Sequence, residues 1–515
     1  MEARAVSGEI DSNAANMLWA TARRAPDKPA IIEAAGDRER SFTTLWGHAL
    51  SLAHLLRAAG VERDDRVAIV LDRGAASAAA YFGALACGGV AVPINETLRP
   101  RQIDYIVKHA GVRAIVSSDA LRGRLPEQPA GIPRIDAEDV ASAPPSSGGG
   151  VALRTGADMA HIIYTSGSTG MPKGVVVSHA NVWAGMRAVV EYLGLSERDR
   201  IASLLPFSFD YGLSQLLCGA GTGASVVVER SPLAPRVVQT LEDRAVTVLP
   251  AVPPLWLQLL NVERFRSQPL GALRVMTNTG GRLPIDAVRA LRRGQPHADL
   301  VLMYGLTEAF RSTYLPPHLV DSKPTSIGRA IPGAEIFVVR EDMTPCAPGE
   351  VGQLVHRGPT VTLGYWNDPE ATDERFGSNP LRPPGTPDAE RVVFSGDLVR
   401  MDEEGDLVFV GRNDAMIKSM GHRVGPDEIT DVLYGSGEIV EAVVTTESDE
   451  MRGDAIIAHV VLRDGGDLGA LERYAARELP RYMQPQRYEV HAELARTPSG
   501  KHDGRAMSEA EERAR

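Results

Sequence analysis

Short apolar runs alternate with amphipathic segments along the first four hundred residues of the chain. We interpret seven of these runs as buried strands: Arg66–Leu71, Val90–Ile94, Arg113–Ser117, Ser225–Glu229, Val246–Pro250, Leu273–Thr277 and Leu300–Tyr304. Segments such as Thr43–Ala59 and Pro100–Ala110 instead carry apolar residues at helical spacing. An alternation of buried strands with helices indicates parallel sheets that are covered by helices.

The pattern changes after Glu350. The segment Glu350–Val410 is rich in strand-like sequence, and a small α/β unit follows Gly411–Asp414. Because 515 residues exceed one ordinary hydrophobic core, we expect at least two domains. We therefore predict an α/β protein with a large N-terminal domain, residues 1–411, of stacked α/β sheets with a β-rich subdomain. A small C-terminal α/β domain should comprise residues 412–515.

Composition and charge exclude several classes of function. The chain is 43% hydrophobic and 23% charged, which is typical of a soluble globular protein, and its net charge of −11 argues against nucleic-acid binding. Cys87, Cys218 and Cys346 are too far apart for a metal site and indicate reduced thiols. The first residues lack the features of a signal peptide, and Ala75–Pro93 fits a buried helix running into a strand better than a membrane span. We expect a cytoplasmic protein without nucleic-acid or membrane partners.

The most informative motif is the loop Tyr164–Gly174, which follows an apolar strand at Met159–Ile163. Its glycines allow backbone N–H groups to approach an anion, its hydroxyls add donors, and Lys173 adds positive charge. The spacing differs from the common P-loop, which needs four residues between its first glycine and a Gly-Lys-Ser/Thr end. The sequence therefore predicts a phosphate-binding loop of a different kind.

This loop resembles the phosphate loop of the adenylate-forming superfamily, which includes acyl-CoA ligases, luciferases and adenylation domains. Further blocks resemble the family's motifs in the same order, from about residue 15 to residue 503: Tyr304–Glu308, Gly364–Trp366, Ser395–Leu398, Gly411–Asp414, Ile417–Gly421 and Pro498–Lys501. The resemblance implies an enzyme that uses ATP and Mg²⁺ to convert a carboxylic acid to its acyl-adenylate. A thiol then displaces AMP, after the small domain rotates about a hinge at Asp414.

The resemblance also implies roles for individual residues. Lys501 is expected to be the main catalytic residue, assisted by Thr307 at the α-phosphate, and Glu308 to be the metal ligand. One carboxylate is enough, because Mg²⁺ keeps waters and phosphate oxygens as its other ligands. The remaining residues implied to bind ATP or AMP are Thr165, Ser166, Gly167, Ser168, Thr169, Gly170, Lys173, Gly280, Gly281, Arg282, Tyr304, Gly305, Asp397 and Arg412.

The segment Leu205–Ser214 should line the acid pocket. Phe209 and Asp210 look like the corresponding pair of amino-acid-activating domains, in which the carboxylate holds the substrate ammonium. A buried carboxylate needs a cationic partner, which is either a substrate amine or a protein arginine such as Arg311. Tyr211 and Thr279 should border the same pocket.

The substrate and the acceptor remain open between two alternatives. The pattern most resembles stand-alone ligases that load β-amino acids onto carrier proteins of macrolactam polyketide pathways. This reading predicts a β-amino or aryl-amino acid and an external acyl carrier protein. Similar Phe-Asp-Tyr-Gly and Glu-Ala-Phe-Arg-Ser stretches also occur in acyl-CoA ligases associated with exopolysaccharide loci. The alternative is therefore an acyl- or aryl-CoA ligase that uses free coenzyme A.

Overall fold

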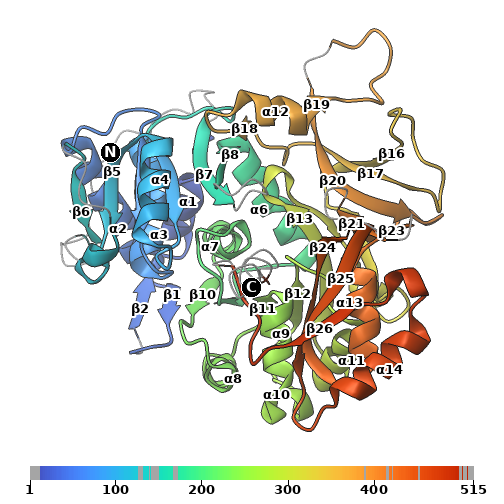
Figure 1. Ribbon diagram of the computed structural model, residues 1–515. Coiled ribbons are helices and arrows are strands. Elements are labelled where there is room, and N and C mark those ends of the chain that lie inside the picture. Colours follow the sequence, from blue (N-terminus) through green and yellow to red (C-terminus); the bar gives the residue numbers. More distant parts are fainter. Residues whose placement is uncertain are drawn as a thin grey trace.

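The computed structural model describes residues 12–36, 38–125, 131–137, 140, 150–165, 172–387, 390–412, 417–419, 422–449, 453–497, 502 and 507. The chain folds into a large N-terminal domain with several sheets and a smaller C-terminal domain, drawn in orange and red in Figure 1. The predicted mixed α/β class is confirmed. Among the described residues, no helix is both long enough and apolar enough to cross a bilayer.

Two large sheets build the N-terminal domain. The first contains, in spatial order, β18 (Gly364–Tyr365), β8 (Lys173–Ser178), β7 (Met159–Thr165), β4 (Val90–Ile94), β3 (Arg66–Val70), β5 (Val112–Ser117) and β6 (Arg134–Asp136). The parallel part of the second contains β13 (Asp299–Leu306), β12 (Val275–Asn278), β11 (Val248–Ala251), β9 (Arg200–Ser203), β10 (Ser225–Val228) and β1 (Pro29–Glu33), with antiparallel β2 (Arg38–Ser41) at its edge.

The second sheet continues beyond β13 as an antiparallel, β-rich region. Its strands are β14 (Phe310–Tyr314), β15 (Ser326–Ala330), β21 (Leu407–Arg412), β20 (Arg391–Met401), β17 (Val351–Arg357) and β16 (Glu335–Val339), with β19 (Phe376–Ser378) beside β20. The short helix α12 (Pro369–Arg375) lies next to it (Figure 1). All seven predicted buried strands are present, with bounds shifted by at most two residues.

Helices fill the space between the two sheets and cover their outer faces. One apolar core joins both sheets to α1 (Asn16–Arg24), α2 (Phe42–Ala58), α3 (Ala75–Cys87), α6 (His179–Leu193) and α7 (Asp210–Thr222). Separate cores bury α4 (Pro100–Ala110) on the first sheet, and α8 (Ala234–Asp243), α9 (Pro253–Leu260), α10 (Glu263–Ser267) and α11 (Ile285–Gly294) on the second. The layering explains why the strands read as continuous apolar runs, since both of their faces are buried.

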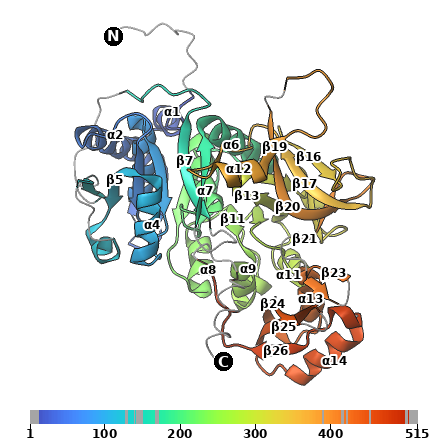
Figure 2. The same cartoon turned by 45° about the horizontal axis from the view of Figure 1, so that its top comes forward.

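The C-terminal domain has its own core. Its sheet contains β23 (His422–Val424), β22 (Ile417–Ser419), β25 (Gly453–Leu462) and β24 (Ile439–Asp449), with β26 (Arg487–Val490) paired to β25. Helices α13 (Pro426–Gly435) and α14 (Leu468–Glu478) pack on one face of this sheet. In Figure 2 this domain lies beside α11 of the large domain. The predicted boundary at residues 411 and 412 stays a prediction.

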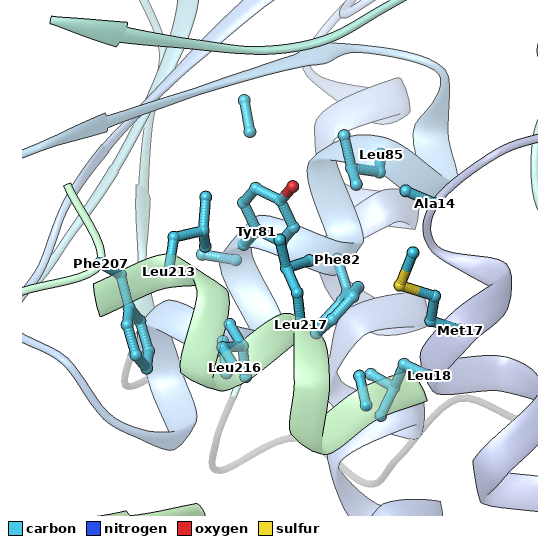
Figure 3. Packing of buried hydrophobic residues seen from close by; sticks show 14 of the residues in the cluster. Ala14, Met17, Leu18, Tyr81, Phe82, Leu85, Phe207, Leu213, Leu216 and Leu217 are labelled. Atoms are coloured by element: carbon cyan, nitrogen blue, oxygen red, sulfur yellow. The ribbon is translucent and has the colours of Figure 1, made fainter. Parts of the chain in front are cut away.

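Helix α7 carries the residues that open the expected acid pocket, and its position is fixed by packing. Leu213, Leu216 and Leu217 belong to the same buried core as Tyr81 and Phe82 of α3 (Figure 3). At the start of the helix, the chain approaches the preceding loop closely at Gly212. A Cβ atom at this position would clash with the backbone carbonyl oxygen of Pro206. Only glycine fits here, so this contact sets where the first turn of α7 lies.

We expect Gly212→Ala to displace the first turn of α7 and to lower the free energy of unfolding by about 1–3 kcal/mol, the usual cost of overpacking. Gly221→Ala is the matched control on the same helix, because its added methyl group meets the flexible end of the Met186 side chain. Thermal unfolding of both variants checks the prediction. Equal melting temperatures for the two variants would contradict it.

Candidate active site

Lys173 and Glu308 are brought together by a third residue, Tyr365. Tyr365 lies on β18, which pairs with β8 next to Lys173, and its ring centre is 5.2 Å from the Lys173 ammonium. The Tyr365 hydroxyl donates a hydrogen bond to Glu308 Oε1. Burial raises the pKa of Tyr365, and the charge of Glu308 adds to this effect. The lysine that ends the phosphate loop and the predicted metal ligand therefore belong to one cluster.

Glu308 and Thr307 occupy a single turn, η2 (Thr307–Ala309), between β13 and β14. The backbone carbonyl of Glu308 accepts a 2.9 Å hydrogen bond from the N–H of Thr362, which fixes the turn to the segment before β18. The Asp368 carboxylate lies 4.0 Å from the Lys173 ammonium. A hard oxygen donor beside a lysine suits Mg²⁺ bound to phosphate oxygens, so these residues fit the implied ion.

Asp397 and Arg412, both predicted to bind the nucleotide, are brought together by strand register. Asp397 on β20 lies opposite Arg412 on β21, and Arg412 Nε is 3.3 Å from Asp397 Oδ1. The Tyr304 hydroxyl donates a hydrogen bond to Asp397 Oδ2, and the Tyr304 ring stacks on His356 at 6.1 Å. Burial and the neighbouring carboxylate raise the pKa of Tyr304 well above its ordinary value. Three predicted nucleotide-binding residues thus form one contact group.

Part of the predicted site lies outside the described residues. Thr165 ends β7 directly opposite Lys173, so the structure describes both ends of the phosphate loop. Three further predictions fall outside the described residues: the loop interior Ser166, Gly167, Ser168, Thr169 and Gly170, the hinge Asp414, and the catalytic Lys501.

Asp210 lines a small cavity between α7, α6 and the Thr307 turn. Thr307 and Phe310 line it beside Asp210, and the remaining walls come from His161, Ile163, Val177, Asn181, Val182, Leu213, Leu217, Thr360 and Thr362. Asp210 is the first residue of α7, and its Oδ1 accepts a hydrogen bond from the backbone N–H of Tyr211. Its Oδ2 lies 3.4 Å from the Thr307 hydroxyl. The carboxylate predicted for the acid pocket and the residue predicted to contact the α-phosphate thus line the same cavity.

Tyr211, which follows Asp210 on α7, is held in the core by contacts with its neighbours. The buried Tyr211 hydroxyl lies 2.6 Å from the Thr277 hydroxyl, and the ring of Phe209 meets the Tyr211 ring edge-on. Thr279 is buried at the end of β12. Arg311 packs on the Tyr211 ring but forms no ion pair with Asp210, although the sequence offered this pairing as one explanation for both residues. Asp210 and Arg311 therefore do not neutralise each other.

The Gly280–Arg282 segment, predicted to contact the nucleotide, instead shows a contact with the small domain. Arg282 Nη1 lies 2.6 Å from Asp431 Oδ2 on α13. Gly280 has a φ of +82°, a conformation that glycine adopts readily, and the Gly281 carbonyl accepts a hydrogen bond from the Asn278 side chain. The loop that follows β12 is therefore also part of the contact between domains, while its role in nucleotide binding stays a prediction.

Sequence reasoning missed two members of this site. The first is Tyr365, whose contacts with Lys173 and Glu308 are not evident from the sequence. Its place in the Gly364–Trp366 motif is the one signal that points to it. The second is His161 of β7, which is buried, with its Nδ1 3.0 Å from the Tyr81 hydroxyl. It also lines the cavity, and burial lowers its pKa to about 3, so the imidazole there is neutral.

The Arg282–Asp431 contact predicts a pH dependence. Burial raises the pKa of Asp431 from 3.8 to about 6; Arg282 opposes this shift, while Asp427 and Glu428 add to it. Because the pKa is higher in the folded state, the native protein binds more protons between these pH values, and stability falls as the pH rises through the window. Asp431→Asn should remove this contribution, so its melting temperature should rise relative to wild type between about pH 4 and pH 6.5.

Melting temperatures measured across this range check the prediction. Asp464→Asn, which removes an exposed carboxylate of the same domain, is the matched control and should follow the wild-type curve. Parallel curves for Asp431→Asn and wild type would show that Asp431 does not titrate in this window.

Comparison with known proteins identifies the family. Residues 18–366 match the model of the AMP-binding enzyme family, and residues 428–501 match its C-terminal domain. The chain is 30% identical over 497 residues to the dimodular nonribosomal peptide synthase of Bacillus subtilis, covering 94% of this chain but only 20% of that protein. Tyrocidine synthase 1 of Brevibacillus parabrevis is 27% identical over 506 residues, with 94% of this chain and 44% of that protein covered. The chain thus spans less than half the length of these two relatives.

Solved structures agree with this assignment. MatB from Rhodopseudomonas palustris with bound ATP has a TM-score of 0.86 and 25% identity, with 97% of this chain and 99% of that chain covered. The o-succinylbenzoate coenzyme A synthetase of Bacillus subtilis, solved with ATP and a magnesium ion, has a TM-score of 0.83 and 26% identity over 95% and 98% of the two chains. The chain belongs to the AMP-binding enzyme family, whose members activate carboxylic acids with ATP and Mg²⁺.

Proposed function

We propose that this enzyme activates a β-amino or aryl-amino acid and transfers it to the phosphopantetheine thiol of an external carrier protein. The observation that carries the proposal is Asp210, a carboxylate in the wall of the cavity that also contains Thr307. An ammonium group on the acid would pair with this carboxylate. A neutral acyl chain offers no cation to this carboxylate and would form no such charge-assisted contact.

The first half-reaction joins two anions, so the site must supply positive charge where they meet. We assign the departing phosphates to Lys173 and the metal to Glu308, because Tyr365 holds these side chains in one cluster. The ion, when bound, would neutralise phosphate oxygens. Thr307 would donate its hydroxyl to the α-phosphate, and Lys501 would stabilise the charge that develops between that phosphate and the acid.

The second half-reaction needs a thiol. Resemblance to stand-alone ligases favours a carrier protein, and one relative is by name a nonribosomal peptide synthase. The alternative acceptor is free coenzyme A, which is supported by structural neighbours that are coenzyme A synthetases or ligases by name. Transfer of the activated acid to a phosphopantetheinylated carrier, compared with formation of the coenzyme A thioester, separates the two acceptors.

ATP–pyrophosphate exchange over β-amino, aryl-amino, α-amino and unsubstituted fatty acids tests the proposed substrate class. We expect the amino-bearing acids to support exchange most efficiently. Activity with unsubstituted fatty acids alone would exclude the proposal that Asp210 binds an ammonium group.

The Asp210→Asn variant keeps the size of the side chain and its hydrogen bond from the Tyr211 N–H but removes the charge. We expect it to lower kcat/KM for the preferred amino acid by roughly 30-fold or more, the effect of removing one partner of a desolvated charge pair. The des-amino analogue should change little. An equal loss for both acids would indicate that Asp210 has a structural role instead.

Lys501→Ala should lower the adenylation rate by roughly 10²–10³-fold, as expected when one group that stabilises transition-state charge is lost. The affinity for ATP, measured by calorimetry, should stay close to that of wild type. Lys108→Ala removes an exposed lysine of α4 and is the control for loss of charge. Normal exchange in Lys501→Ala would remove this residue from the mechanism.

A further inference from the structure

Two histidines and a glutamate converge on the small domain, outside the site described above. His459 is on β25, Glu489 is on β26, and His491 directly follows β26; we call these three residues the histidine cluster. His459 Nδ1 lies 3.1 Å from His491 Nε2 and 3.6 Å from Glu489 Oε2. His491 Nε2 and Glu489 Oε2 are 3.9 Å apart. Imidazole nitrogens and carboxylate oxygens are among the ligands by which proteins bind Zn²⁺.

Strand register brings the three side chains to one face of the sheet. β25 and β26 are parallel neighbours (Figure 1), and His459 lies opposite Glu489. His491 follows Glu489 by two residues, so its side chain points to the same side. The backbone N–H of His491 also donates a 2.9 Å hydrogen bond to the Val460 carbonyl. Val460 belongs to the core beneath α13 and α14, so the preceding His459 faces the opposite side of the sheet.

The spacing of the three ligand atoms suits a single ion. Ligands held about 2.0–2.1 Å from Zn²⁺ in tetrahedral geometry lie about 3.3 Å from one another. The observed separations of 3.1, 3.6 and 3.9 Å are close to this value. His459 is fully buried, whereas Glu489 and His491 are partly exposed. An ion can therefore reach the ligands from solvent, and a water molecule can complete its coordination.

Neighbouring groups orient two of the ligands for metal binding. His459 Nε2 lies 2.8 Å from the Thr445 hydroxyl. When this nitrogen donates its proton to the hydroxyl, Nδ1 keeps the lone pair that a metal needs. Arg487 Nε lies 2.8 Å from Glu489 Oε1, while Glu489 Oε2 is the oxygen nearer to the histidines. Arg487 also pairs with Glu447, so two carboxylates accompany its single positive charge and the site still attracts a cation.

Among the described residues, another group of convergent ligands differs from the histidine cluster in its charge balance. Its three carboxylates, Asp402, Glu404 and Asp406, all form ion pairs of 2.5 to 2.7 Å with the Lys323 ammonium. A cation of the protein itself therefore occupies the centre of that group. It serves as a structural ion-pair network and not as a metal site.

We propose that His459, Glu489 and His491 bind one Zn²⁺ ion. The ion holds the chain that leaves β26 against β25, ten residues before Lys501. Its role is structural, because a site that joins a strand to the segment after its neighbour stabilises the folded domain. This ion is distinct from the Mg²⁺ expected at Glu308, which lies on the large domain.

Titration of the tag-free, metal-free full chain with Zn²⁺, followed by calorimetry without nucleotide, tests the proposal. We expect one ion per chain, and Mg²⁺ should not compete because it prefers oxygen ligands. His491→Ala and Glu489→Gln should each lower the Zn²⁺ affinity by roughly 100-fold or more, at least the cost of losing a partner outside the coordination sphere. His54→Ala, which removes an exposed histidine of α2, is the matched control and should keep the wild-type affinity.

Thr445→Val tests the orientation of His459. This variant keeps the volume of the side chain but removes the hydroxyl beside His459 Nε2. We expect its Zn²⁺ affinity to be roughly 10–100-fold lower than that of wild type, the usual cost of losing such a partner. An unchanged affinity would overturn the assignment of His459 Nδ1 as a ligand.

Metal-dependent melting gives a second readout, which does not depend on activity. A saturating Zn²⁺ concentration should raise the melting temperature of wild type and of His54→Ala, but not that of Glu489→Gln. Glu308→Gln changes the expected Mg²⁺ ligand and should keep the rise. Circular dichroism without metal checks that the variants retain the wild-type fold, which we expect because the Glu489 and His491 side chains are partly exposed.

Three outcomes would overturn the proposal. If wild type binds no Zn²⁺, the histidine cluster is only a hydrogen-bonded network. Equal Zn²⁺ affinities of wild type, His491→Ala and Glu489→Gln would place the ion elsewhere on the chain. Loss of Zn²⁺ binding in Glu308→Gln, with affinity retained in the other two variants, would place it in the ATP site.

Discussion

The arrangement of the site depends on the pairing of β18 with β8. Backbone hydrogen bonds from Leu363 to Val176 and from Trp366 to Gly174, 2.9 and 2.7 Å long, join segments that are far apart in sequence. They place the Tyr365 side chain over Lys173. The same strand is tied to the Glu308 turn by a backbone hydrogen bond from Thr362, so one short segment sets the spacing of a lysine and a carboxylate. Groups fixed in this way need little reorganisation when charge develops.

The acid-binding side of the site depends on three consecutive residues of α7. Asp210 faces the cavity, Tyr211 packs over Arg311 and bonds to Thr277, and Gly212 lets the helix lie against the Pro206 carbonyl. Because the three residues share one helical turn, a substitution that displaces the backbone at Gly212 also moves Asp210 and Tyr211. Specificity for the acid is therefore coupled to the packing of α7 between the two sheets.

Features that are local in sequence were predictable, whereas contacts between distant segments were not. Buried parallel strands such as Val90–Ile94 are continuous apolar runs, and the Thr307–Glu308 turn lies within a compact motif. The Arg282–Asp431 ion pair joins residues of two domains, and nothing near Arg282 in the sequence identifies its partner. The sequence near Arg311 likewise does not identify its neighbours, because residue types alone leave a pairing with Asp210 open. Tertiary structure orients Arg311 toward aromatic rings instead.

The β18–β8 pairing also constrains how the protein is made. All other strands of that sheet lie within residues 66–178, yet its last strand is synthesised nearly two hundred residues later. A nascent chain that has not reached Gly364 leaves one edge of β8 without its native partner. Open strand edges favour association with other chains. Until β18 has been translated, the unpaired edge of β8 can therefore associate wrongly with other chains. The segment that aligns Lys173 with Glu308 thus also closes the sheet during biosynthesis.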